Sequence, residues 1–239
     1  MTIQMKQIHG KQRRNVGFTL VELLTVIAIM AVVAGLVVGL AGVAGKAKRK
    51  ARVTAELNQL VAAIDSYYAK YNDYPPQVGG RFDVNTLYHE LVGTAYRADT
   101  VTPANSTFAT PDGRLSLTPA GVSTYFGISG FANAGDGSPA NNYLPTIRPN
   151  QTAFLKVVGQ PNLTAQALIV PAEAPPGRGI PSSGTNPGDI FATTVEGEPK
   201  VVNPWRYNAS NPKNNPNSYD LWAEIRVGDD TIIIGNWDN

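Results

Sequence analysis

Few side chains in this sequence have the types and spacing that catalysis requires. The 239 residues include no Cys and two His, so thiol nucleophiles and Cys-based metal sites are excluded and a paired-histidine centre is disfavoured. Lys46 follows a Gly as in a phosphate-binding loop, but Leu40 and Ala47 stand where that motif requires Gly and Ser or Thr. We therefore expect no catalytic residues, no cofactor and no enzymatic activity.

One carboxylate stands out because it lies at the start of a long apolar run. Glu22 precedes a stretch from Leu23 to Ala44 that contains only Leu, Val, Ile, Ala, Met and Gly, apart from Thr25. A helix of about 20 such residues is long enough to cross a bilayer. An ionisable group at full depth in a membrane costs a few kcal/mol, and we see no explanation for Glu22 within a single chain. We expect it to need a partner from another subunit.

The residues around this carboxylate form a motif. They read Gly17-Phe18-Thr19-Leu20-Val21-Glu22-Leu23-Leu24 and follow a basic N-terminus. This string resembles the N-terminus of the type IV pilin superfamily, in which a basic leader ends in Gly. The resemblance implies that a prepilin peptidase cuts between Gly17 and Phe18 and that Phe18 is then N-methylated. It also implies that Glu22 pairs with the α-ammonium of Phe18 on a neighbouring subunit, since a buried charge needs compensation.

Two simpler interpretations of the N-terminus explain less. A secretory signal has an apolar segment of about 7–15 residues with no acid near its start, and this run is longer. An ordinary membrane anchor explains the length but leaves Glu22 unexplained. The resemblance also places the leader in the cytoplasm and the head outside a single-pass inner membrane, before transfer to a periplasmic or surface filament. Basic residues flank the run on both sides, so charge alone does not set this orientation.

The net charge depends on the leader. Residues 1–17 hold four basic residues and no acid, and without them 16 Lys and Arg oppose 18 Asp and Glu, a net charge of −2. After Arg52 the balance is 11 basic against 17 acidic residues, a net charge of −6. Non-specific binding to nucleic acid requires clustered positive charge. We expect no nucleic-acid partner.

Four segments follow from these patterns. They are a leader at 1–17, a transmembrane and filament-core half-helix at 18–45, an amphipathic half-helix at 46–76 and a globular head at 77–239. Apolar residues at helical spacing mark one face of the second half-helix: Val53, Leu57, Leu60, Ile64, Tyr67 and Tyr71. Pro75 and Pro76 end the helix, because Pro lacks an N–H donor and restricts the residue before it.

The end of the chain has the pattern of a β-hairpin. Residues 219–227 alternate between apolar and polar, Gly228 begins a turn, and Thr231 to Ile234 return. Several strings resemble the major pseudopilin of type II secretion systems: Tyr71-x-x-Tyr74-Pro75, Asn203-Pro204-Trp205-Arg206-Tyr207, Ser218-Tyr219-Asp220-Leu221 and Asn236-Trp237. The resemblance covers both ends of the chain and not its middle.

Calcium is the one metal that this resemblance raises. Major pseudopilins hold calcium in a longer Gly- and Asp-rich loop between the last strands, whereas this hairpin has only Gly228-Asp229-Asp230. Calcium takes about 6–8 oxygen ligands, which two adjacent acids in a tight turn do not supply. We expect solvated turn residues and assign no metal ligand.

Upstream, Asp83 is placed to cap a short helix that carries His89. We expect the His89 side chain to be packed in the head or exposed to solvent, and not to bind a metal.

The middle of the chain, 99–188, is rich in Pro, Gly, Asn, Ser and Thr and has only brief apolar runs. We predict a loop-rich insertion there.

The predicted fold is α+β and pilin-like, with a long N-terminal helix on a small C-terminal antiparallel sheet. The predicted function is that of a structural subunit of a type II secretion pseudopilus or type IV pilus-like filament. Its expected partners are prepilin peptidase, copies of itself and other pilin-like subunits, membrane lipid before assembly and, indirectly, a secretion platform and ATPase. The alternative is a pilin-like adhesin or substrate-recognition module that uses 99–188.

Overall fold

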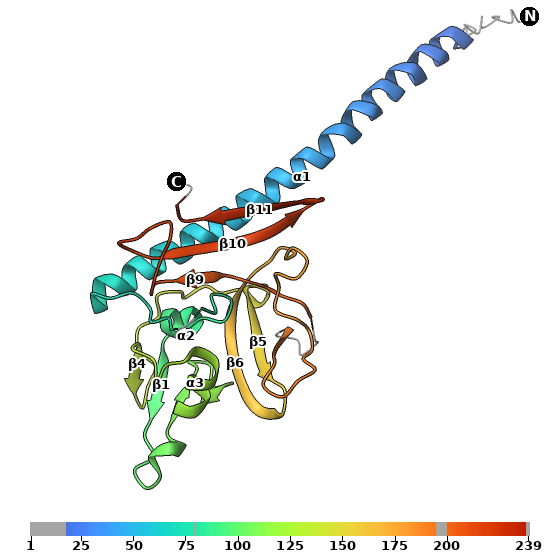
Figure 1. Ribbon diagram of the computed structural model, residues 1–239. Helices are drawn as coiled ribbons and strands as arrows, with labels where there is room; N and C mark the ends of the chain where they lie inside the picture. The colour runs from blue at the N-terminus through green and yellow to red at the C-terminus, as the bar shows by residue number, and fades with distance from the viewer. Residues whose placement is uncertain (1–17, 79, 195–199, 238–239) are drawn as a thin grey trace, which may run out of the picture. The chain divides into compact units, whose positions relative to one another are not determined.

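The computed structural model describes residues 18–78, 80–194 and 200–237, except for the side chains of 37–44 (Figure 1). One N-terminal helix is followed by antiparallel sheets, which confirms the predicted α+β class. The chain divides into two units, Met1–Lys46 and Ala47–Asn239. Both hydrophobic cores lie entirely within the second unit, so this unit contains everything that stabilises the head.

The first helix, α1, runs from Leu20 to Tyr71. The predicted apolar stripe on its second half is confirmed, because Val53, Leu57, Leu60, Ile64 and Tyr67 are all at most 5% exposed and Tyr71 is half-buried. The helix ends at Asn72, whose φ of 53° is left-handed and whose backbone N–H donates to the Tyr68 carbonyl at 2.8 Å. Asn tolerates this conformation better than most residues, and the prolines that follow keep the helix from resuming.

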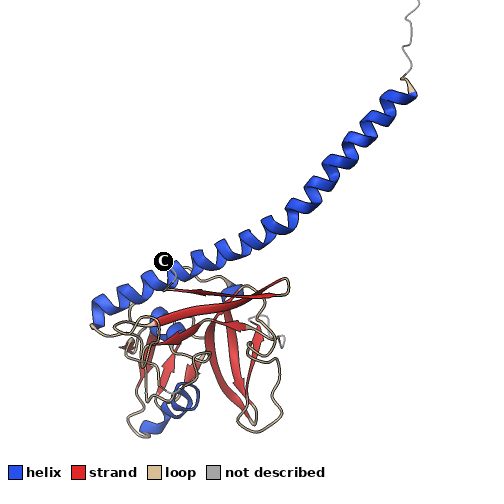
Figure 2. Cartoon of the chain, turned by 45° about the horizontal axis from the view of Figure 1, so that its top comes forward, coloured by secondary structure: helices blue, strands red, loops and turns tan. Residues whose placement is uncertain are grey.

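The stripe packs on a three-stranded sheet with the order β11-β10-β9, along which α1 runs in Figure 2. Its strands are β9 (Arg206–Asn208), β10 (Asp220–Val227) and β11 (Asp230–Gly235). The predicted hairpin is confirmed, with Val227 opposite Asp230 and Gly228 at a φ of 69° in the turn. The first core joins this sheet to α1 and α2 through residues that include Ile64, Leu91 and Leu221.

Two further four-stranded sheets complete the head. One has the order β3-β2-β1-β4 and the other β7-β5-β6-β8, and β1 with β4 is the parallel pair. The strands of the first are β1 (Thr94–Arg97), β2 (Thr107–Ala109), β3 (Ser116–Leu117) and β4 (Ala134–Asp136). Those of the second are β5 (Thr152–Val157), β6 (Gln160–Val170), β7 (Ile190–Thr194) and β8 (Asn203–Pro204). The short helical elements between them are η1 (Pro103–Asn105), α3 (Pro119–Phe126) and η2 (Pro149–Gln151).

The prediction that 99–188 is a loop-rich insertion on one small sheet was wrong. This segment contributes β2 to β6 and α3, and it builds most of a second core around Phe126, Phe131 and Leu155. The sequence pattern does not reveal these strands, because their inward positions carry small residues such as Ala153 and Ala165, both fully buried. Alternation of Ala with polar residues gives little hydrophobic contrast in sequence.

Two local expectations also need correction. Helix α2 (Leu87–Val92) begins after Thr86 rather than Asp83, and Asp83 instead forms an ion pair with Arg81 at 3.1 Å. On β10 the polar positions are not all on a solvated face, since Asp220 and Glu224 are 2% and 4% exposed. Arg178 donates two hydrogen bonds of 2.6 Å to Glu224, which compensates the buried carboxylate.

In the part of the chain that the structure describes, no helix combines the length and apolar character needed to cross a membrane. The predicted span at 18–45 includes 37–44, whose side chains lie outside the described residues.

Candidate processing and assembly site

The predicted cut lies immediately before α1. Gly17 falls outside the described residues, and Phe18 is the first residue of the structure, with 81% of its side chain exposed. Phe18 and Thr19 precede the first helical residue, Leu20. A peptidase must bind its substrate in an open backbone conformation, and helical hydrogen bonds are absent just ahead of a helix. Phe18 thus lies in non-helical backbone ahead of α1.

Thr19 and Glu22 form a reciprocal cap on the first turn of α1. The backbone N–H and the hydroxyl of Thr19 donate to Glu22 Oε2 at 2.9 and 2.8 Å, and the N–H of Glu22 donates to Thr19 Oγ1 at 3.2 Å. This is the pattern of a capping box, in which residues three apart satisfy backbone N–H groups that have no helical partner. The acid also lies where the helix dipole favours a negative charge.

The expectation that Glu22 has no explanation within a single chain was therefore wrong. The carboxylate caps its own helix, and a Thr three residues before a Glu is the sequence signature that could have shown it. Both bonds go to Oε2, so the described residues leave Oε1 available to a further donor. Capping and pairing with a neighbouring α-ammonium can thus operate on the same side chain.

The helix that follows this cap exposes an apolar surface. From Phe18 to Leu36 every large apolar side chain is at least 41% exposed. Gly35 has no atom within 4 Å of the position that a Cβ would occupy, and Gly39, which forms a G-x-x-x-G pair with it, lies outside the described side chains. An apolar surface of this extent is a site for lipid or for other helices. Small residues spaced by four let helices approach closely in lipid.

Comparison with known families identifies this N-terminus. Residues 13–38 match the model described as the prokaryotic N-terminal methylation motif. The chain has a type IV pilin-like N-terminus. The match spans the predicted cut, Glu22 and the start of the apolar run, and it covers less than half of the chain. No curated protein and no solved structure matches the chain.

The head contains a buried carboxylate, Glu90, that the sequence analysis did not single out. Glu90 on α2 is fully buried and accepts bonds from the Tyr67 hydroxyl at 3.1 Å and from the backbone N–H groups of Ala132 and Asn133 at 2.9 and 2.8 Å. Burial raises the pKa of Glu90, while these hydrogen bonds oppose that rise. Because both of its oxygens accept hydrogen bonds, Glu90 joins α1, α2 and the segment just before β4 (Ala132 and Asn133).

His89 is packed in the head. Its ring stacks on Phe131 with centroids 4.7 Å apart, and its Nε2 accepts the backbone N–H of Gln166 at 3.4 Å. Burial lowers the pKa of His89 to about 3, so the ring is neutral near pH 7. A neutral, enclosed imidazole of this kind stabilises packing and is not placed for proton transfer.

Asp220, at the start of β10, is a second buried carboxylate whose oxygens are already engaged. The backbone N–H groups of Lys213, Asn214 and Asn215 donate to it at 2.7 to 3.2 Å. Donors directed at both oxygens leave their lone pairs unavailable to a cation. Among the residues described, no three His, Cys, Asp or Glu side chains gather as metal ligands, the Asp229-Asp230 turn included.

A cavity of about 810 Å³ lies at one end of the β7-β5-β6-β8 sheet. Its walls come from the end of β6, including Ile169 and Val170, from Thr194 at the end of β7 and from Val201. Volumes of this size hold small ligands, and the walls are mixed apolar and polar. Part of the lining belongs to 99–188, the segment that the alternative function invokes.

Proposed function

We propose that this chain is a structural subunit of a type II secretion pseudopilus or type IV pilus-like filament that supports protein export. In this proposal prepilin peptidase cuts between Gly17 and Phe18 in the inner membrane and Phe18 is methylated. The processed helix then leaves the lipid and assembles with other pilin-like subunits, driven indirectly by a secretion platform and ATPase. The role is structural rather than catalytic.

The observation that carries this proposal is the methylation motif at 13–38 followed by an exposed apolar helix. Such a helix is stable in lipid before assembly and against other helices afterwards. In this proposal Glu22 acts both in lipid and in the filament. It caps its own helix through Oε2 and leaves Oε1 for the α-ammonium of a neighbouring subunit. A pair of this kind fixes the register of adjacent subunits, because an unpaired buried charge costs several kcal/mol.

The test combines processing with assembly. With active prepilin peptidase, the mass of the mature protein should correspond to a chain that begins at methylated Phe18, and sheared filaments should contain it. A Gly17→Ala variant should be cut poorly, since the leaders of the family that this N-terminus resembles end in Gly and the peptidase must fit the residue at this position. A mature chain that begins at Met1, or one that never enters filaments, would overturn the proposal.

A second candidate function, that of a pilin-like binding subunit, is favoured by the 810 Å³ cavity. Val201 lines this cavity and is 57% exposed, so Val201→Trp should fill it without disturbing either core. Normal filament yield together with lost adhesion or export would favour binding by the cavity. Normal adhesion and export would leave the structural role as the better account.

A further inference from the structure

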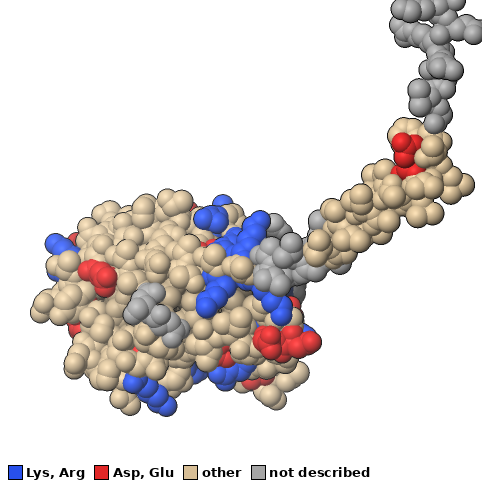
Figure 3. Space-filling model, turned by 90° about the horizontal axis from the view of Figure 1, so that it is seen from above, with Lys and Arg blue, Asp and Glu red and all other residues tan. Residues whose placement is uncertain are grey.

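Four basic residues of α1 lie close together where the head begins. Lys48, Arg49, Lys50 and Arg52, here called the basic collar, are all exposed. Figure 3 shows Lys and Arg side chains gathered around this part of the helix. The collar follows the apolar run, which ends at Ala44, and precedes Val53, the first residue of the buried stripe.

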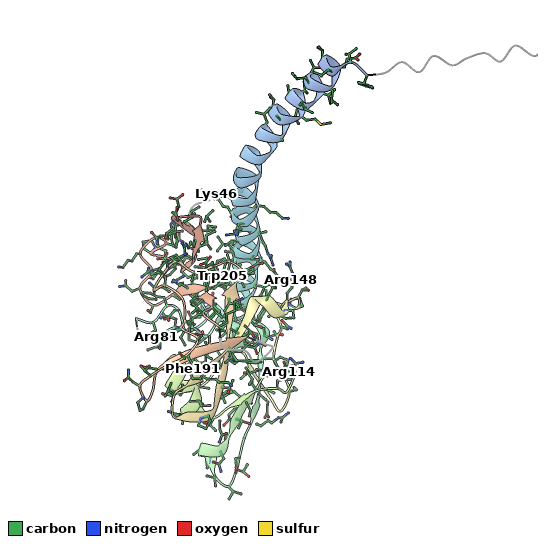
Figure 4. All side chains as sticks on the ribbon, turned by 90° about the vertical axis from the view of Figure 1, so that its right-hand side faces the viewer. Lys46, Arg81, Arg114, Arg148, Phe191 and Trp205 are labelled. Atoms are coloured by element: carbon green, nitrogen blue, oxygen red, sulfur yellow. The ribbon has the colours of Figure 1, made fainter. Side chains whose placement is uncertain are left out.

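The collar covers more than one side of the helix. At about 100° per residue, Lys48 lies on the side of α1 away from the stripe, and Arg49 and Lys50 lie near the stripe's two edges. Arg52 lies between Lys48 and Arg49, beside the buried Glu56. A further cation comes from a distant part of the sequence, Arg148, just before η2 (Figure 4). Burial raises the pKa of Glu56, and the charges of Arg52 and Arg148 oppose that rise, so Arg148 lies near this part of α1. Positive charge therefore spans more than half of the circumference of α1.

This charge is largely uncompensated within the described chain. Glu56, the nearest acid along α1, is 4% exposed and forms an ion pair with Arg52 at 3.5 Å. The described residues contribute no ion pair to Lys48, Arg49 or Lys50. After Arg52 the chain has a net charge of −6, so the collar and the head have opposite signs. A polyanionic surface is attracted at the collar and repelled elsewhere.

We propose that the basic collar binds the anionic head groups of a lipid bilayer and so sets the depth and orientation of the subunit before assembly. The inference rests on the proposed membrane insertion of the preceding run. That insertion would bring the collar to the level of the lipid phosphates, and Lys and Arg side chains reach such phosphates readily. Clustered basic residues beside a span bind anionic lipid through their summed charge.

A second copy of the chain offers another anionic surface, its acidic head. The distribution of charge favours lipid over this partner. Lipid head groups can approach an inserted helix from all of its exposed sides. One docked protein would cover a single side and leave either Lys48 or Lys50, which lie on nearly opposite sides, without a partner.

The experiment uses the unit Ala47–Asn239, which contains both cores whole, and flotation with vesicles. The vesicles contain phosphatidylcholine alone or phosphatidylcholine with phosphatidylglycerol. The collar variant is Lys48→Gln, Arg49→Gln and Lys50→Gln, with Arg52 retained because it pairs with buried Glu56. The matched control changes three other exposed cations, Lys70→Gln, Arg97→Gln and Lys213→Gln, and so has the same net charge. Thermal unfolding establishes that all three proteins are folded.

The unaltered unit should bind vesicles that contain phosphatidylglycerol, and its affinity should fall as salt rises. The collar variant should bind about a hundredfold more weakly, since each of its three lost cations contributes about fivefold in affinity for an anionic surface. The control should bind within about twofold of the unaltered unit, because its cations lie outside the collar. Equal losses in both variants would overturn the proposal, and so would equal binding to phosphatidylcholine alone.

Two further measurements distinguish lipid binding from self-association and from a failure of the proposed function. If sedimentation shows that the unit self-associates through the collar and does not bind vesicles, the partner is the acidic head of a second copy and the lipid proposal is wrong. In the full chain, the N-terminal mass and the filament yield test the proposed function independently of vesicle binding. A chain that is cut and assembled normally but lacks vesicle binding would refute the collar proposal alone.

Discussion

Glu22 Oε2 accepts both the backbone N–H and the hydroxyl of Thr19, at 2.9 and 2.8 Å. The acid is therefore held at the start of α1 by its own chain before any neighbour is present. A preorganised carboxylate loses less side-chain entropy when it pairs with a second subunit. The capping seen at Glu22 and its proposed pairing with a second subunit can be separated by substitution.

Glu22→Val should leave leader cleavage intact and reduce filament yield strongly, because the α-ammonium of a neighbouring Phe18 then lacks a buried counter-charge. Thr19→Val is the matched control, since it removes the hydroxyl of the cap but retains the carboxylate. Its effect on filament yield should be the smaller of the two. The measurements are the N-terminal mass and the yield of sheared filaments. Wild-type yield from Glu22→Val would show that charge pairing is not required.

The stripe on α1 should determine the stability of the head. Leu57 is 1% exposed in the first core, so Leu57→Ala should lower the free energy of unfolding by about 2–5 kcal/mol. Val101→Ala, at a side chain that is 91% exposed, should change it by less than about 0.5 kcal/mol. Urea unfolding of Ala47–Asn239 measures both. Similar effects at the two sites would show that α1 does not support the core.

His89 should make the head sensitive to acid. Its pKa is lowered in the folded state to about 3, so the stability from a neutral ring is complete above the unfolded value of about 6.5 and is lost as pH falls toward 3. Wild type should lose about 3 kcal/mol more than His89→Gln between pH 6.5 and 4. The acids Glu56 and Glu90 are present in both proteins and cancel in the comparison. NMR detection of His89 titrating near pH 6.5 in the folded protein would contradict this prediction.

Asp220 should anchor the loop before β10 without a metal. Asp220→Asn replaces one accepting oxygen with a donor that faces backbone N–H groups, and it should lower the free energy of unfolding by about 1–3 kcal/mol. Calcium or a chelator should leave the unfolding midpoint of the wild type unchanged. A midpoint that rises with calcium in the wild type but not in Asp220→Asn would place a cation at this carboxylate.

Local patterns in the sequence determined the parts of this protein that depend on neighbours along the chain. The apolar run after Glu22, the stripe from Val53 to Tyr67 and the hairpin at Gly228 each show a clear period or turn signal. Such signals arise from backbone geometry, which repeats within a few residues. The type IV pilin-like N-terminus could likewise be recognised from the sequence, since its motif lies in one continuous segment, residues 13–38.

Only the tertiary structure decided how the middle of the chain is organised. Ala153 and Ala165 pair across β5 and β6 with neighbours that local pattern does not specify, and small buried residues give no hydrophobic period. The same limit applies to polar groups. Glu90, Asp220 and Glu224 are tolerated in the interior because Tyr67, backbone N–H groups and Arg178, some of them more than 20 residues away, supply the compensating donors. Burial of a charge depends on partners in space, and those are fixed only when the chain has folded.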